Sequence, residues 1–258
     1  MKLLFIGDVV GRPAREYLKS FLPRLRCDLG VDFVVANGEN VAGGSSFTEE
    51  TTKVLFNAEV DVVTSGDHVF KKKESKFVVE SMDVIRPLNY GDDAPGKGYI
   101  IKTFAGQKIA VINLLGRVFM PPMDCPFKAV DSLLKKIKDQ VKIILVDFHA
   151  EATSEKVAMG YFLSGRVSAV CGTHTHIPTA DERIIDGATA YITDVGMTGS
   201  FDSVLGREKA AVIERFFTNM PVRFNLAHDD VRIQGVVIDV DSQTGKALSI
   251  KRVEYCQA

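Results

Sequence analysis

The sequence predicts an α/β protein with mixed sheets, and three features of the 258-residue chain lead to this prediction. Short apolar or β-branched runs alternate with amphipathic stretches through most of the chain, as in proteins built from strand–helix units. From residue 220 onward, apolar and polar residues alternate with a period of two, which is typical of half-exposed antiparallel strands. Hydrophobic residues make up 46% and charged residues 25%, the composition of a folded globular protein. We therefore expect two sheets packed face to face, and one domain spanning residues 1–258.

Apolar spacing locates the elements of the N-terminal third. Arg15–Leu29 carries apolar residues at helical spacing. A second helix is expected over Glu49–Phe56, because Thr48 followed by two glutamates suits the positive end of a helix dipole. Short apolar runs predict three buried strands, at Leu3–Ile6, Phe33–Ala36 and Val60–Val63.

The middle and C-terminal parts of the chain are expected to supply the remaining strands. A hairpin is predicted around Ala105-Gly106, and a helix is expected to begin near Glu151. Turn residues at Asp229-Asp230 and Ser242–Gly245 separate the last three strands. The strands predicted in this region are Gly98–Lys102, Lys108–Asn113, Ile143–Phe148, Val167–Cys171, Thr189–Ile192, Met220–Asn225, Val231–Val240 and Ala247–Val253.

Charge and cysteine usage exclude several classes of protein. The 32 basic and 33 acidic residues leave a formal charge of −1, which argues against binding nucleic acid mainly through its phosphates. The four cysteines form no close pair and are interpreted as free thiols of a reducing compartment. The apolar run after Met1 is shorter than a signal core, and no run approaches the length of a membrane span. We therefore expect a cytoplasmic protein that does not bind membranes.

Polar side chains follow five of the predicted strands, at the point where each strand ends. In open α/β sheets, ligands bind beyond the carboxyl ends of strands, where such loops converge. Four of the five histidines belong to this set, and carboxylates accompany them. For any one of these residues alone, a structural role is the better interpretation, but together they favour a metal site. The candidate ligands are Asp8, Glu39, Asp67, His68, His149, His174 and His176, and Asn40 follows one of the same strands.

The residue types also constrain the metal. Imidazole and carboxylate without thiolate suit first-row ions such as zinc, iron or manganese. Seven or eight candidate groups are too many for one tetrahedral ion but fit a dinuclear centre with a bridging carboxylate. Two divalent cations facing Asp8, Glu39 and Asp67 leave a net charge of +1, which attracts an anionic phosphoester. A bound cation would also lower the pKa of water enough to generate the attacking hydroxide.

His68 directly follows Asp67, so the two side chains are expected to point in different directions. If Asp67 is a ligand, His68 stands just outside the coordination sphere, where it could protonate the departing oxygen as a general acid. The alternative is that His68 only orients a ligand or serves as an outer ligand.

The pattern of these residues resembles the calcineurin-like metallophosphoesterase superfamily, and within it the YmdB-like 2′,3′-cyclic-nucleotide phosphodiesterase subfamily. The resemblance extends over nearly the whole chain. It rests on six stretches: Gly7–Pro13, Asn37–Asn40, Gly66–His68, Phe148–Glu151, Gly172–His176 and Thr193–Gly199.

The resemblance implies a four-layer α/β/β/α sandwich and a di-metal phosphodiesterase active on 2′,3′-cyclic nucleotides. It also implies that Glu39 bridges two ions and that His68 is the proton donor. One ion would be held by Asp8, Glu39, Asn40 and His176, and the other by Glu39, Asp67, His149 and His174.

The chain departs from the family pattern at two positions. Val10 stands where the wider superfamily has a histidine, a loss that the subfamily shares, and Asp67 stands where the subfamily has asparagine. Asp67 adds a negative charge, so we expect it to hold the second metal more tightly and to weaken its Lewis acidity.

The sequence predicts a hydrolase that acts on a small phosphodiester, either a 2′,3′-cyclic nucleotide or the end of an RNA. The altered ligand Asp67 leaves an alternative open, in which the metal-binding fold acts as a regulator through a protein or RNA partner with little turnover. A metal-dependent amide hydrolase is a weaker alternative, because such enzymes often carry His-x-His after the first strand and here it comes late. A homo-oligomer is compatible with the sequence.

Overall fold

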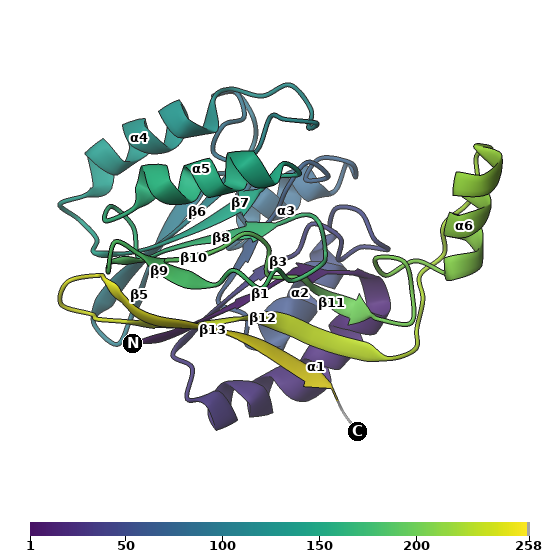
Figure 1. The fold of residues 1–258 in the computed structure, drawn as a ribbon, viewed down its shortest axis with the longest axis horizontal. Helices are drawn as coiled ribbons and strands as arrows, with labels where there is room; N and C mark the ends of the chain where they lie inside the picture. Colours follow the sequence, from purple (N-terminus) through teal and green to yellow (C-terminus); the bar gives the residue numbers. More distant parts are fainter. Residues whose placement is uncertain (257–258) are drawn as a thin grey trace.

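Two β-sheets pack face to face in the computed structural model, which describes residues 1–256 (Figure 1). The larger sheet has the strand order β2-β11-β12-β1-β3-β4, and β13 pairs with β12. Strands β1, β3 and β4 are parallel, whereas β12 runs antiparallel to β1. The strands are β1 (Lys2–Ile6), β2 (Asp8–Val9), β3 (Phe33–Asn37), β4 (Val62–Thr64), β11 (Met197–Ser200), β12 (Val231–Val240) and β13 (Ala247–Cys256).

The second sheet has six strands in the order β5-β6-β7-β8-β10-β9. Its centre is parallel, and an antiparallel strand closes each edge. These strands are β5 (Tyr99–Phe104), β6 (Gln107–Leu115), β7 (Ile143–His149), β8 (Ala169–Thr173), β9 (Arg183–Ile185) and β10 (Thr189–Ile192).

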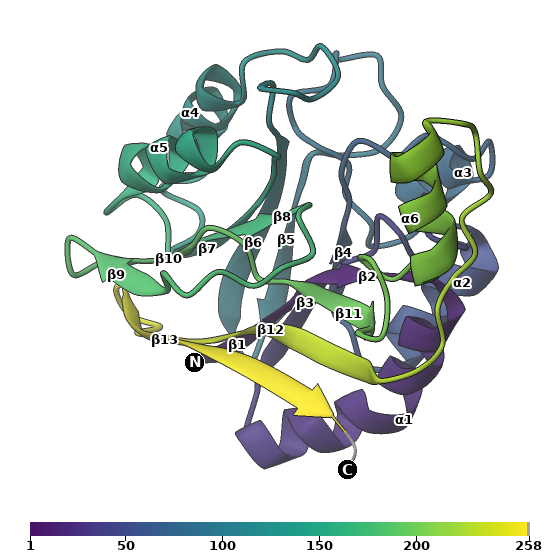
Figure 2. The same cartoon turned by 45° about the vertical axis from the view of Figure 1, so that its right-hand side comes forward.

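Helices cover the outer face of each sheet, which gives the four layers that the family resemblance implied. The larger sheet is covered by α1 (Gly11–Leu29), α2 (Glu49–Asn57) and α3 (Ser75–Ser81). The other sheet is covered by α4 (Pro126–Ile137) and α5 (Thr153–Leu163), which lie at the top of Figure 1. A further helix, α6 (Lys209–Thr218), stands at the rim of the molecule (Figure 2).

The side chains of β1 show how the layers are held together. Leu4 and Ile6 pack toward the helices, whereas Leu3 and Phe5 enter the core between the sheets. Successive residues of a strand point to opposite faces, so an unbroken apolar run is what a strand buried on both sides requires. On the other side of this inter-sheet core lie Val111 and Leu145 from β6 and β7.

The structure differs from the predicted local structure at one strand, one unpredicted exposed helix and the start of α1. Met220–Asn225 is not a strand, because its residues lie on the surface without a ladder of partners, so its period of two reflects no sheet face. Helix α6 was not predicted, since among its residues only Val212 is buried and the helix has no apolar stripe facing a core. Helix α1 begins at Gly11 rather than Arg15, because Pro13 is tolerated in the first turn, where N–H groups have no partner within the helix.

The cysteines are unpaired in the structure, as predicted, and Cys171 is buried. Over residues 1–256, none of the helices combines the length and apolar character needed to cross a bilayer.

Candidate metal centre

All eight predicted site residues lie together where the carboxyl ends of strands from both sheets meet. Asp8 is the first residue of β2, and the loops that follow β3 and β4 carry the acidic, amide and imidazole groups at positions 39, 40, 67 and 68. His149 ends β7, while His174 and His176 follow β8. The larger sheet therefore supplies the acidic ligands, and the second sheet supplies three of the four imidazoles.

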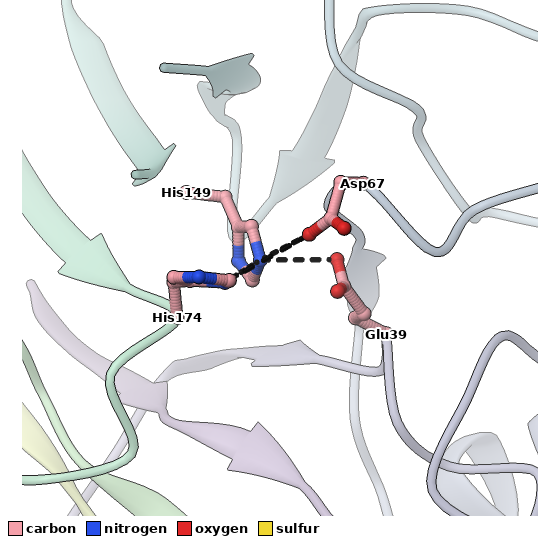
Figure 3. Close-up of side chains that lie close together, drawn as sticks. All are labelled: Glu39, Asp67, His149 and His174. Atoms are coloured by element: carbon pink, nitrogen blue, oxygen red, sulfur yellow. Dashed lines mark hydrogen bonds and ion pairs between the residues drawn. The ribbon is translucent and has the colours of Figure 1, made fainter. Parts of the chain in front are cut away.

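Four of these side chains form a compact cluster, which we call the Glu39 cluster: Glu39, Asp67, His149 and His174 (Figure 3). One potential ligand atom from each lies within 4.8 Å of the others. His149 Nε2 is 3.1 Å from Glu39 Oε2 and 3.5 Å from Asp67 Oδ1. His174 Nδ1 lies 3.0 Å from the same His149 nitrogen. The four groups thus face one point from different directions.

The remaining predicted ligands form a second group beside it, the Asp8 group: Asp8, Asn40 and His176. Asn40 Nδ2 lies 3.2 Å from His176 Nε2 and 3.5 Å from Asp8 Oδ1. The two groups are joined through Asp8, whose Oδ2 accepts a 3.1 Å hydrogen bond from the backbone N–H of His174. The arrangement therefore offers two neighbouring sets of ligands.

His68 lies between the two sets. Its Nδ1 is 3.2 Å from Glu39 Oε1 and also 3.2 Å from Asn40 Oδ1, while Nε2 is 3.6 Å from Asp67 Oδ2. A third of its side chain is exposed, whereas His149 is fully buried. His68 therefore has access both to the acidic groups and to solvent, and it is more exposed than His174, of which 26% is exposed.

Polar contacts outside the cluster orient two of the candidate ligand imidazoles, through a buried chain for His149 and through the exposed Glu151 for His174. His149 Nδ1 is 2.9 Å from Thr173 Oγ1, which donates a 2.7 Å hydrogen bond to Asp147 Oδ1. His174 Nε2 is 3.1 Å from Glu151 Oε2. Each contact fixes the nitrogen that faces away from the cluster, the device that orients histidine ligands in metal sites. The contribution of Glu151 was missed, although the residue lies only two positions after His149.

The His174–His176 loop has an unusual backbone that a buried ion pair supports. His174 and His176 have φ values of 106° and 65°, in the region that residues with a side chain rarely adopt. Between them, the backbone N–H of Thr175 donates a 3.0 Å hydrogen bond to Asp194 Oδ2. The same oxygen is 2.8 Å from Lys156 Nζ, and both ion-pair side chains are 1% exposed. This support was not predicted from the sequence.

Burial and charge act in opposite directions on the ionisable groups. Burial raises the pKa of Glu39 to about 7, against the opposing effect of His149. Burial also lowers the pKa of His174 to about 4. For His149, burial alone would lower the pKa, but the charge of Glu39 and the close contacts with the Asp67 and Glu39 carboxylates outweigh it and raise the pKa well above its usual value. In the metal-free protein, the positive charge on His149 thus offsets part of the cost of burying the carboxylates of Glu39 and Asp67.

The side chains present fit a bound cation. Glu39 Oε2 and Asp67 Oδ1 are buried and lack a hydrogen-bond partner within the described residues, yet both face His149. Ligand atoms about 2.0–2.2 Å from one ion lie at most about 4.4 Å apart, close to the spacing observed. Gly66 keeps the space open, because a Cβ there would lie 1.6 Å from Glu39 Oε2. Carboxylate oxygens and imidazole nitrogens are the donors that first-row ions prefer.

A cavity of about 200 Å³ opens beside these residues, and we call it the catalytic cavity. Glu39, Asn40, His68, His174 and His176 line it, together with four residues that include Gly44 and Arg207. Arg207 donates a 2.7 Å hydrogen bond to the carbonyl of Gly44. Nothing in the sequence around Arg207 distinguishes it from a surface arginine, because its neighbours in the cavity are distant in the chain.

Comparisons with known proteins agree with this geometry. The family model described as "YmdB-like protein" matches residues 4–253. A Bacillus subtilis protein named 2′,3′-cyclic-nucleotide 2′-phosphodiesterase is 47% identical over 254 residues, 98% of this chain and 96% of that protein.

Two solved structures are also similar over almost the full length of the chain. A hypothetical protein from Thermus thermophilus is 39% identical, with a TM-score of 0.94 and complete coverage of both chains. A structure described as a novel phosphatase, from Mycoplasma pneumoniae, is 34% identical with a TM-score of 0.92. It covers 99% of this chain and 93% of its own. These similarities confirm the fold class that the sequence predicted.

Proposed function

Because the chain belongs to the YmdB-like protein family, we propose that it is a metal-dependent phosphodiesterase that hydrolyses small phosphodiesters, with 2′,3′-cyclic nucleotides as its substrate class. The observation that carries the proposal is the convergence of acidic, amide and imidazole side chains from both sheets on one open cavity. The name of the Bacillus subtilis relative supports the class of reaction.

Two divalent transition-metal ions, of iron, manganese or zinc, suit the two sets of ligands. We assign Asp8, Glu39, Asn40 and His176 to one ion, and Glu39, Asp67, His149 and His174 to the other. Glu39 can serve both, because its two oxygens face different sides: Oε2 lies by His149 and Oε1 by His68. When bound, such ions supply positive charge to the phosphate and lower the pKa of water.

The protein's own residues then position the substrate and move the proton. A water molecule adds to phosphorus through its oxygen and releases one proton to solvent, and the bond from phosphorus to one ribose oxygen breaks. His68 Nε2 or Nδ1 delivers a proton to that oxygen, which leaves as a hydroxyl group of a phosphomonoester product. His68 suits this role because it lines the catalytic cavity while its ring contacts Glu39 and Asn40. The buried contact of His149 with Thr173 and the contact of His174 with Glu151 hold the two rings in position during the reaction.

Hydrolysis of adenosine 2′,3′-cyclic phosphate, measured with and without added Mn²⁺ and after chelation, tests the proposal. We expect hydrolysis that chelation removes and Mn²⁺ restores. Asp8→Ala should abolish it, whereas Asp28→Ala, which removes an exposed carboxylate on α1, should have no effect. Hydrolysis that persists after chelation and in Asp8→Ala would rule out the proposed centre.

A further inference from the structure

A second cavity, of about 440 Å³, adjoins the catalytic cavity, and we call it the outer cavity. Arg207 lines both cavities, and the neighbouring glycines Gly43 and Gly44 each line one of them. The catalytic cavity is smaller than the roughly 300–1,000 Å³ typical of ligand pockets, whereas the outer cavity lies within that range. A substrate that extends past Arg207 would therefore find space on the far side.

The lining of the outer cavity is suited to a nucleotide. Arg223 and His228 contribute donors, and Glu208 is the carboxylate on this wall. Glu208 Oε2 accepts a 3.0 Å hydrogen bond from Asn225 Nδ2, so a neutral amide occupies part of its acceptor capacity. Phe224 also lines the cavity, with 40% of its surface exposed, and an exposed aromatic ring is a platform on which a base can stack.

Arg207 carries a positive charge that nothing nearby neutralises. Its guanidinium donates to the backbone carbonyls of Gly43, Gly44 and Phe224, at 3.3, 2.7 and 3.4 Å. Within residues 1–256 no carboxylate forms an ion pair with it, and burial lowers the pKa of Arg207 without an opposing acidic group. The carbonyl contacts hold the planar guanidinium in place but leave its positive charge available for an anion. A phosphate matches the spacing of the guanidinium N–H groups.

We propose that the outer cavity binds the nucleotide unit next to the one being hydrolysed, so that the preferred substrate is an RNA end carrying a 2′,3′-cyclic phosphate and not a mononucleotide. Arg207 binds the phosphate that links the two units, Arg223 binds the distal backbone, and Phe224 stacks on the base. The inference rests on the proposed phosphodiesterase function, because it needs the cyclic phosphate in the catalytic cavity. The positive charge of Arg207 and Arg223 is local to the outer cavity, so it is compatible with the net charge of −1 of the whole chain.

The test compares adenosine 2′,3′-cyclic phosphate with the dinucleotide ApA ending in the same cyclic phosphate. In the Mn²⁺-loaded wild type, we expect kcat/KM for the dinucleotide to be at least about tenfold higher, the effect of one or two charge-assisted hydrogen bonds. Arg223→Ala should reduce the dinucleotide-to-mononucleotide ratio about tenfold through KM. Arg24→Ala, which removes an exposed arginine of α1, is the matched control and should leave the ratio unchanged.

Equal kcat/KM values for the two substrates in the wild type, or a ratio that Arg223→Ala leaves unchanged, would overturn the inference while leaving the proposed function intact. Failure to hydrolyse either substrate would instead contradict the proposed function.

A binding assay tests the outer cavity separately from the proposed phosphodiesterase function, because it needs no turnover. In the presence of chelator, a labelled ApA 3′-phosphate should bind at least about tenfold more tightly than adenosine 3′-phosphate, and Arg207→Ala should remove the difference. Equal binding of the two probes overturns the inference whatever the hydrolysis assay shows.

Discussion

Asp67 places a full negative charge at a position where the family pattern has a neutral amide. Its Oδ1 is buried without a hydrogen-bond partner in the described part of the chain and lies 3.5 Å from His149 Nε2. Burial alone would raise the pKa of Asp67, but the nearby positive charges of His149 and His68 hold it below its usual value. The carboxylate is therefore ionised at neutral pH and ready to bind a cation.

The Asp67→Asn variant should consequently hold its second metal ion less tightly. Removing one unit charge a few ångströms from the ion should weaken retention at least about tenfold, even with substantial screening. The neutral ligand should also raise the Lewis acidity of the ion, and so kcat at saturating metal. Metal content after dialysis against a graded chelator, together with kcat, measures both effects. Unchanged metal retention would show that Asp67 does not face the ion, and Asp28→Asn provides the matched surface control.

The His68→Ala variant tests whether the protein acts as an enzyme or as a regulator of the same fold. As proton donor it should contribute about 10²–10⁴-fold to kcat, so His68→Ala should lose that much activity and keep its metal. Steady-state kinetics and metal analysis on the same sample test this expectation. If a strain carrying His68→Ala kept every effect of the wild-type protein in the cell while hydrolysis was lost, the regulatory alternative would be correct. Parallel loss of both would exclude it.

Which residues meet could be predicted from the sequence, but not which atoms face one another. The ligand candidates all follow strands, and the carboxyl ends of parallel strands share an edge, so their convergence was predictable. Glu151, Asp194 and Arg207 were missed because the groups that they contact are distant in the chain, so the neighbouring sequence does not reveal the contacts. The assignment of ligands to individual ions stays a prediction.

At the scale of elements, α5 supports the His174–His176 loop through Lys156. The helix places Lys156 against Asp194, and Asp194 in turn accepts the backbone N–H groups of Thr175 and Gly196. One carboxylate thereby fixes two loops: the His174–His176 loop, whose histidines have positive φ, and its own loop after β10. The position of these ligands therefore depends on an ion pair buried between α5 and the loop after β10.

Lys156→Met should destabilise the metal-free protein by about 3–5 kcal/mol, because it leaves Asp194 as an unpaired buried charge. Lys209→Met is the matched control: its partner is Asp202, and about half of each side chain is exposed, so the loss should be below about 1 kcal/mol. Urea unfolding of both variants measures the difference. A loss below about 1 kcal/mol in Lys156→Met would mean that the pair does not hold the loop.

The elements that were predicted well are those whose pattern reflects burial on a defined face. Val231–Val240 and Thr189–Ile192 were predicted with the bounds that the structure shows, because both lie in sheets with a buried face. Met220–Asn225 has a similar alternation but no sheet to join, so the pattern alone was misleading. Helices α4 and α6 were not predicted, and α6 lies mostly exposed at the rim.

Across the whole molecule, the candidate centre lies on the seam between the two sheets. The acidic candidate ligands come from the larger sheet and three imidazoles come from the other, so an ion held by the Glu39 cluster would contact both. Away from the centre, the sheets are joined by an apolar core that includes Phe5 and Leu145. Metal binding should therefore act as a crosslink between two layers that are otherwise held by non-directional packing.

Metal binding should accordingly stabilise the whole fold and not one sheet alone. At a free Mn²⁺ concentration about 100 times the dissociation constant, one site contributes about 2.7 kcal/mol, which corresponds to a rise in Tm of about 5–10 °C for a chain of this size. Asp67→Ala removes a larger-sheet ligand from the Glu39 cluster and His149→Ala removes one that the other sheet supplies to the same cluster. Each should reduce the rise, measured against its own metal-free Tm. A rise that survives in both variants would place the stabilising ion elsewhere. A rise lost in only one of them would mean that a single sheet holds the ion, because a crosslink requires ligands from both sides.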